Sequence, residues 1–130
     1  MTKIFAHRGA SAYAPENTME AFELAAKQGA EGIELDVHVT KDGEVVVTHD
    51  EKIDRVSNGS GFIKDMTLRE LKRLSFHNHM ESYVGAGIPT LREVLEYVST
   101  TNMDVNIELK TGIYWYPQIE EKTAFIVQET

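Results

Sequence analysis

Four short polar motifs hold the residues of this chain that could do chemistry. In chain order they are His7-Arg8, Glu34-x-Asp36, His49-Asp50 and Glu108-x-Lys110. Histidine titrates near neutral pH, so two histidines can serve as general acid and general base. Arginine can hold a phosphate through two parallel hydrogen bonds. The set is consistent with acid–base chemistry on a small anionic substrate, although each motif alone is more often structural.

The carboxylates are spaced so that they could share a cation. Glu34 and Asp36 are two residues apart in an expected strand, so their side chains leave one face about 7 Å apart. Two ionised carboxylates that face a protein interior repel each other and lose hydration. A divalent cation relieves both costs, and oxygen ligands favour Ca²⁺ or Mg²⁺ over Zn²⁺. Glu108 would add a third carboxylate, with Lys110 as an anion contact or charge balance. For each motif alone the alternative is a solvated strand face.

The other polar candidates carry weaker signals. His38 shares the expected face of Glu34 and Asp36 but lies at the hairpin end, and His77-x-His79 falls in a polar segment expected to be a solvated loop. Trp115 and its neighbouring tyrosines could wall a substrate pocket or pack a loop. The run 15–18 is interpreted as the start of a helix, with a supporting contact to Arg8 as the alternative.

The elements that must position these residues alternate between strand and helix. Strands are predicted at 4–6, 33–39, 45–47 and 105–110, the second and last with strict alternation of apolar and polar residues. Helices are predicted after Asn17, Thr67 and Thr90, each of which has a glutamate three residues later. Gly29 suits the residue just past the first helix. A further helix is expected near Gln118.

A βα rhythm with acids on one strand face predicts an α/β fold of the (β/α)8 TIM-barrel type. In such a barrel the apolar face packs under the helices, and polar side chains near the strand ends form the site. Residues 51–88 break the rhythm and are interpreted as a small insertion subdomain. A complete barrel needs about 250 residues. We therefore expect residues 1–130 to supply the N-terminal portion of one catalytic domain, about three of eight βα units.

Composition excludes some classes of function. The net charge of −8 argues against nucleic-acid binding, which needs a surplus of lysine and arginine. The chain has no cysteine, so disulfides and thiolate metal sites are excluded. The first residues do not resemble a signal peptide, and no apolar stretch has transmembrane length. A cytoplasmic protein without a membrane span is expected.

The ordered motifs resemble the glycerophosphodiester phosphodiesterase family. The resemblance begins with His7-Arg8-Gly9 and the run 15–18, and continues through 34–37, 40–43 and His49-Asp50. Arg55, the glycines at 59 and 61, and the runs 88–91 and 107–110 complete it. The resemblance covers nearly the whole chain, and its ordered set of motifs is highly specific.

The resemblance implies a metal-dependent hydrolase that converts glycerophosphodiesters such as glycerophosphocholine to glycerol 3-phosphate and an alcohol. It implies His7 and His49 as the catalytic acid–base pair. It implies Arg8 and Lys110 as phosphate contacts, and Glu34, Asp36 and Glu108 as ligands of Ca²⁺ or Mg²⁺. The process served would be lipid and glycerol metabolism.

Two other functions stay open at this stage. One is a phospholipase of the same barrel type, which would act on intact lipid. The other is a non-catalytic barrel fragment that binds or assembles. Because family members carry more strands, the sequence is expected to be part of a longer enzyme or to close its barrel in a homo-oligomer.

Overall fold

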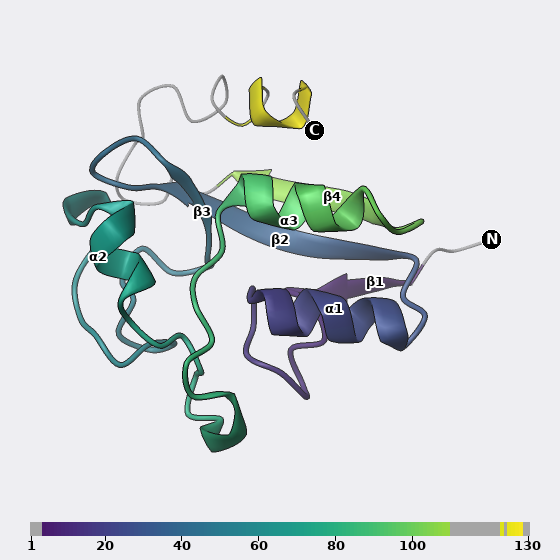
Figure 1. The fold of residues 1–130 in the computed structure, drawn as a ribbon, viewed down its shortest axis with the longest axis horizontal. Helices are drawn as coiled ribbons and strands as arrows, with labels where there is room; N and C mark the ends of the chain where they lie inside the picture. Colours follow the sequence, from purple (N-terminus) through teal and green to yellow (C-terminus); the bar gives the residue numbers. More distant parts are fainter. Residues whose placement is uncertain (1–3, 110–122, 124, 129–130) are drawn as a thin grey trace.

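The chain forms one mixed sheet with helices packed on it, as the computed structural model in Figure 1 shows. The structure describes residues 4–109, 123 and 125–128. Its longer elements are β1 (Phe5–His7), α1 (Met19–Lys27), β2 (Gly32–Val39), β3 (Val45–Val47), α2 (Leu68–Lys72), α3 (Leu91–Val98) and β4 (Asp104–Leu109). Two short 3-10 helices, η1 (Ile63–Asp65) and η2 (Glu81–Tyr83), lie between β3 and α3.

β2 is the central strand of the sheet. It pairs in parallel with β1 and with β4, and its last residues form an antiparallel hairpin with β3. Gly43 closes the hairpin with a φ of 84°, a left-handed conformation that glycine adopts without steric cost. Parallel β1, β2 and β4 with intervening helices are the arrangement that builds a (β/α)8 barrel, so the predicted fold class is confirmed for this part of the chain.

Helix starts follow the predicted capping patterns, with one correction. Thr67 and Thr90 each form a capping box with the glutamate three residues later. α1 is capped by Thr18, whose hydroxyl accepts from the Ala21 backbone N–H, and not by Asn17 as the sequence predicted. Asn17 instead adopts a φ of 56°, and its amide points to Asp36. Gly29 follows the helix with a φ of 82°, as predicted.

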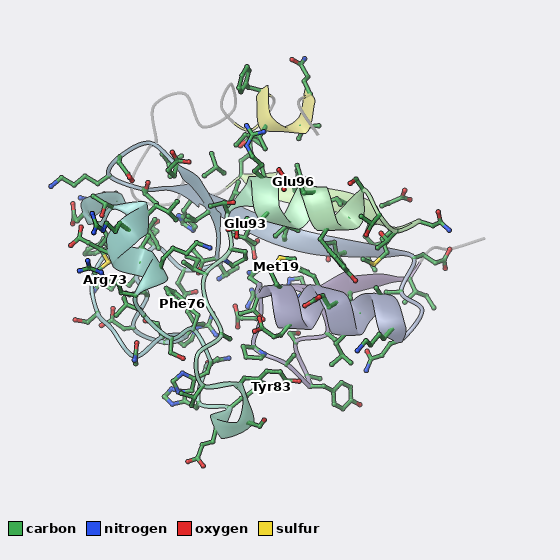
Figure 2. All side chains as sticks on the ribbon, viewed as in Figure 1. Met19, Arg73, Phe76, Tyr83, Glu93 and Glu96 are labelled. Atoms are coloured by element: carbon green, nitrogen blue, oxygen red, sulfur yellow. The ribbon has the colours of Figure 1, made fainter. Side chains whose placement is uncertain are left out.

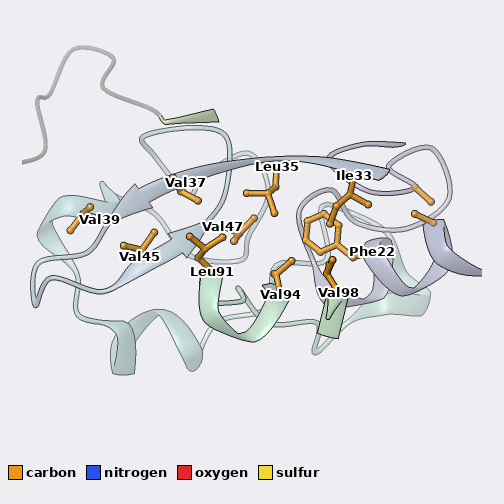
Figure 3. Close-up of a cluster of buried hydrophobic side chains, with 12 residues drawn as sticks. Phe22, Ile33, Leu35, Val37, Val39, Val45, Val47, Leu91, Val94 and Val98 are labelled. Carbon is orange, nitrogen blue, oxygen red and sulfur yellow. The ribbon is translucent and has the colours of Figure 1, made fainter. Parts of the chain in front are cut away.

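The main core lies between the sheet and helices α1 and α3 (Figure 3). Ile33, Leu35, Val37 and Val39 of β2 all belong to it, which confirms the predicted alternation. Phe22 from α1 and Leu91 from α3 contribute fully buried side chains. With the apolar face of β2 covered, Glu34, Asp36 and His38 face the other side.

A second buried cluster joins Val46 of β3 to apolar residues of the segment between β3 and α3. It consists of Val46, Ile53, Val56, Ile63, Leu71, Phe76 and Ile88. In Figure 1 this segment, with α2, lies at the end of the sheet away from the N-terminus. Figure 2 labels Phe76 in this segment and Tyr83, the last residue of η2. That residues 51–88 form an insertion subdomain of a single catalytic domain stays a prediction.

Strand boundaries differ slightly from the prediction. β1 begins and ends one residue later than expected, so His7 is its last residue and not the residue after it. β4 begins at Asp104. The predicted helix start at Gln118, the aromatic run around Trp115 and the candidate Lys110 lie outside the described residues. Across the described ranges, no helix has the length and apolar character to cross a membrane.

Candidate active site

Strand register brings the chemistry-bearing residues to one place. His7 on β1 lies opposite Glu34 on β2, and Asp36 on β2 lies opposite Glu108 on β4. These four residues line a cavity of about 150 Å³, together with Leu35, Asn106 and Ile107. The cavity is at the carboxyl ends of parallel strands, where barrel active sites lie.

Two amides hold the carboxylates of β2. Asn106, opposite Glu34 in the register, donates to Glu34 Oε1 at 3.2 Å. Asn17 donates to Asp36 Oδ2 at 3.2 Å, and Asp36 is only 2% exposed. A buried carboxylate needs such donors because burial removes the water that would otherwise solvate its charge.

Arg8 is held in an unusual conformation beside Asp36. Its φ is 56°, in the left-handed region that non-glycine residues seldom occupy. Backbone bonds fix it there: its N–H donates to Glu34 O, and its carbonyl accepts from Asn17 N–H. The guanidinium donates to Glu16 Oε2 at 3.1 Å and lies 3.7 Å from Asp36 Oδ2. The contact between residues 15–18 and Arg8, which the sequence left as an alternative, is therefore present.

His49 is held at both its ring and its backbone. Its Nδ1 lies 2.8 Å from Asp50 Oδ1, and its carbonyl oxygen lies 2.8 Å from Nε2 of His38. His38 is 1% exposed, so this buried ring anchors the segment that carries His49. If the proton of neutral His49 is on Nδ1, where it is donated to Asp50 in a hydrogen bond, then Nε2 of His49 is a proton acceptor.

The acids around Arg55 are kept ionised by ion pairs. Hydrogen bonds from Arg55 lower the pKa of Asp50 to about 2, and the hydrogen bond from His49 acts in the same direction. At Glu16 burial alone would raise the pKa, but the hydrogen bond and charge of Arg55, with the charge of Arg8, outweigh it and lower the pKa. Both carboxylates in turn raise the pKa of Arg55.

The three carboxylates fit a hard divalent cation by their chemistry. Glu34, Asp36 and Glu108 present oxygen ligands to one cavity. In the described part of the chain, no three histidine or acidic side chains are close enough to hold a metal ion in their present positions. Arg8 Nε and Asn17 Oδ1, both beside Asp36, are buried and lack hydrogen-bond partners among the described residues. Such atoms are available to a bound group.

The sequence of the chain matches a known protein family over most of its length. Residues 7–128 match the model of the glycerophosphoryl diester phosphodiesterase family. The chain belongs to this family. It is 51% identical over 129 residues to a glycerophosphodiester phosphodiesterase of Caldanaerobacter subterraneus subsp. tengcongensis, a match that covers 98% of this chain and 53% of that protein.

Solved structures of the family share the fold. A glycerophosphodiester phosphodiesterase from Agrobacterium tumefaciens superposes with a TM-score of 0.88 and 42% identity, over 99% of this chain and 53% of that one. A phosphodiesterase from Oleispira antarctica, in complex with the product sn-glycerol-3-phosphate, superposes with a TM-score of 0.86 and 37% identity. This match covers 99% of this chain and 51% of that one. The chain therefore spans about half the length of the family members it matches.

Some of the predicted site residues line this cavity, and others do not. His7, Glu34, Asp36 and Glu108 line one cavity. Arg8 does not line the cavity but contacts Asp36, which does. His49 is not among the residues that line the cavity. The weaker candidate His77 bonds instead to Ser75, with Nδ1 2.7 Å from Oγ.

Three residues at the site were missed as functional candidates. Asn106 could have been suspected because it shares a strand face with Glu108. Glu16 and Arg55 belong to motifs that carry the family resemblance, but their contact with each other joins residues 39 positions apart and had no sequence signal.

Proposed function

We propose that this protein is a metal-dependent glycerophosphodiester phosphodiesterase that releases glycerol 3-phosphate and an alcohol from substrates such as glycerophosphocholine. The observation that carries the proposal is the gathering of His7 and three carboxylates around one cavity at the strand ends. Family membership supports it, as does the product bound to the Oleispira antarctica enzyme.

Glu34, Asp36 and Glu108 would hold the cation, either Ca²⁺ or Mg²⁺. When bound, it supplies positive charge that offsets the negative charge developing on the phosphoryl oxygens. Arg8 would contact the phosphate from the side of Asp36, and Lys110 is proposed to contribute a second contact. A cation there would also offset the repulsion between Asp36 and Glu108, which face each other across adjacent strands.

His7 and His49 would move the protons. The substrate's own 2-hydroxyl attacks phosphorus, a P–O bond forms, and the bond to the head-group alcohol breaks. His49 suits the role of base, because a proton held on Nδ1 by Asp50 leaves Nε2 free to accept. His7, which lines the cavity, would donate its proton to the leaving alkoxide. Water then opens the cyclic phosphate with the two roles reversed.

Turnover of soluble and membrane substrates tests the substrate class. We expect the purified protein with Ca²⁺ to release glycerol 3-phosphate from glycerophosphocholine and to leave phosphatidylcholine vesicles intact. Preferential cleavage of vesicle lipid would instead support the phospholipase alternative. Binding of glycerophosphocholine without turnover of either substrate would support a non-catalytic module. Homo-oligomer formation and a cytoplasmic location stay predictions.

A further inference from the structure

An unbroken series of ion pairs connects three segments beside the proposed site. Arg55 donates from Nε to Asp50 Oδ2 at 2.8 Å and from one terminal nitrogen to Asp50 Oδ1 at 3.2 Å. It also donates from both terminal nitrogens to the two oxygens of Glu16, at 2.7 and 3.0 Å. Glu16 then accepts from Arg8. Arg55 is therefore the centre of the series, with one carboxylate on each side.

The guanidinium of Arg55 is committed to these two carboxylates. Of its five N–H donors, four take part in the bonds to Asp50 and Glu16. The Glu16 side chain is only 9% exposed, so it is a fixed anchor, whereas Arg55 itself is 45% exposed. An arginine whose donors are used in this way is poorly placed to bind substrate but well placed to hold an acid in position.

The acid that Arg55 holds is the one that orients His49. Asp50 Oδ1, which faces His49 Nδ1 at 2.8 Å, also accepts from Arg55. Rotation of the Asp50 carboxylate would break both contacts at once. Without a fixed acceptor, the proton of a neutral imidazole is free to occupy either ring nitrogen.

We propose that Arg55 is a positioning residue. By bridging Asp50 to the buried Glu16, it fixes the orientation of the Asp50 carboxylate and thereby keeps the proton of neutral His49 on Nδ1. The proposal rests on the proposed role of His49 in acid–base catalysis. It adds a residue from the segment after β3 to the machinery and explains why Glu16 contacts two arginines. Through Glu16, the same series couples the orientation of His49 to that of Arg8.

Position, and not charge, is the means by which Arg55 acts. The pKa of Asp50 is about 2 with Arg55 in place, and its ordinary value is 3.8. Asp50 is thus ionised at neutral pH with or without Arg55. Loss of Arg55 should therefore leave the Asp50 carboxylate ionised but remove the restraint on the direction of that carboxylate.

The chain offers a matched control for this ion pair. Lys72 on α2 lies 2.7 Å from Glu93 on α3, so it too ties the segment between β3 and α3 to the rest of the fold. Figure 2 shows Glu93 at the start of α3. Lys72→Met removes this exposed ion pair, but its contacts do not reach His49.

Nitrogen NMR of the His49 imidazole, assigned with His49→Gln, tests the proposal without requiring activity. At neutral pH the wild type should show one tautomer with the proton on Nδ1. Arg55→Met should give a mixture of tautomers, and Lys72→Met should not. Arg55→Lys keeps the charge but lacks the planar fork, so it should restore the wild-type pattern only in part. A single Nδ1–H tautomer in Arg55→Met would overturn the proposal.

Kinetics separates this proposal from the proposed function. If wild type hydrolyses glycerophosphocholine, Arg55→Met should lower kcat by about tenfold or more with a smaller change in KM. Lys72→Met should match wild type. If Arg55→Met keeps the kcat of the wild type, the positioning role is contradicted but the proposed function is not. If the wild type is inactive, the proposed function is contradicted, and the NMR result alone decides the role of Arg55. Glu16→Gln, which weakens the other anchor, should shift the tautomers in the same direction and serves if Arg55→Met does not fold.

Discussion

Asp36 on β2 lies directly opposite Glu108 on β4, so two carboxylates occupy paired positions on neighbouring parallel strands. Adjacent strands are about 4.8 Å apart, and like charges in paired positions destabilise a sheet. Arg8 lies beside Asp36, and a cation shared by the two carboxylates would offset their repulsion further. This arrangement is the basis for the metal proposal, and it leads to a test that needs no substrate.

Ca²⁺ or Mg²⁺ should raise the melting temperature of the protein. A ligand at 100 times its Kd stabilises the folded state by about 2.7 kcal/mol, so differential scanning calorimetry should detect the shift. Asp36→Asn should abolish most of it, because a charged oxygen ligand is lost. Glu81→Gln, an exposed acid in η2, is the control and should keep the full shift. An equal cation shift in wild type and Asp36→Asn would place the metal elsewhere.

Replacement of either proposed catalytic histidine should lower kcat far more than it raises KM. His7→Gln and His49→Gln each remove a proton-transfer group, which contributes about 10²- to 10⁴-fold to the rate. Steady-state hydrolysis of glycerophosphocholine measures both constants. His79→Asn is a suitable control, because His79 is exposed in a loop with a φ of 63° that asparagine tolerates. Near-normal kcat in both histidine variants would refute the acid–base assignment.

The Asp50–Arg55 pair should stabilise the fold only above strongly acidic pH. The folded-state pKa of Asp50 is depressed from 3.8 to about 2. The contribution of the Asp50–Arg55 pair to the free energy of unfolding is therefore fully present above pH 3.8 and is lost as the pH falls through about 2. Denaturant titrations of wild type and Arg55→Met should give stability differences that shrink across this window. A difference that stays constant through it would show that the pair does not stabilise the ionised acid.

Gly9, directly after Arg8, should not tolerate a side chain. A Cβ at this position would lie 2.8 Å from backbone and side-chain atoms of Ala21, and its φ is 78°. Gly29 has a similar φ of 82° but nothing within 4 Å, so Gly29→Ala controls for the backbone strain alone. Gly9→Ala should cost at least about 1 kcal/mol more than Gly29→Ala in the free energy of unfolding. Equal costs would mean that α1 shifts freely away from the site.

The sequence allowed much of the fold to be predicted, because its signals are local. Alternation along 33–39 gave β2 and its two faces, and the threonine–glutamate pairs gave the starts of α2 and α3. The prediction of Asn17 as the N-cap of α1 was wrong because the neighbouring Thr18 is also a good N-cap residue. Tertiary contact with Asp36 decided between them.

The candidate site was only partly predictable, for a physical reason. Glu34, Asp36 and Glu108 follow strand periodicity, and His7 was expected directly after a strand, so all four carry a sequence signal. The contact of Arg55 with Glu16 depends on how distant segments pack, and no periodicity encodes it. That Arg8 adopts a left-handed conformation could not be read from its residue type either.

Phosphorus NMR of glycerophosphocholine incubated with the purified protein bears most directly on the proposed activity. With Ca²⁺ or Mg²⁺ present, the substrate resonance should be replaced by that of glycerol 3-phosphate. EDTA should stop the conversion, and excess cation should restore it. Full conversion in EDTA would contradict the metal proposal, and no conversion under any cation condition would contradict the proposed phosphodiesterase activity.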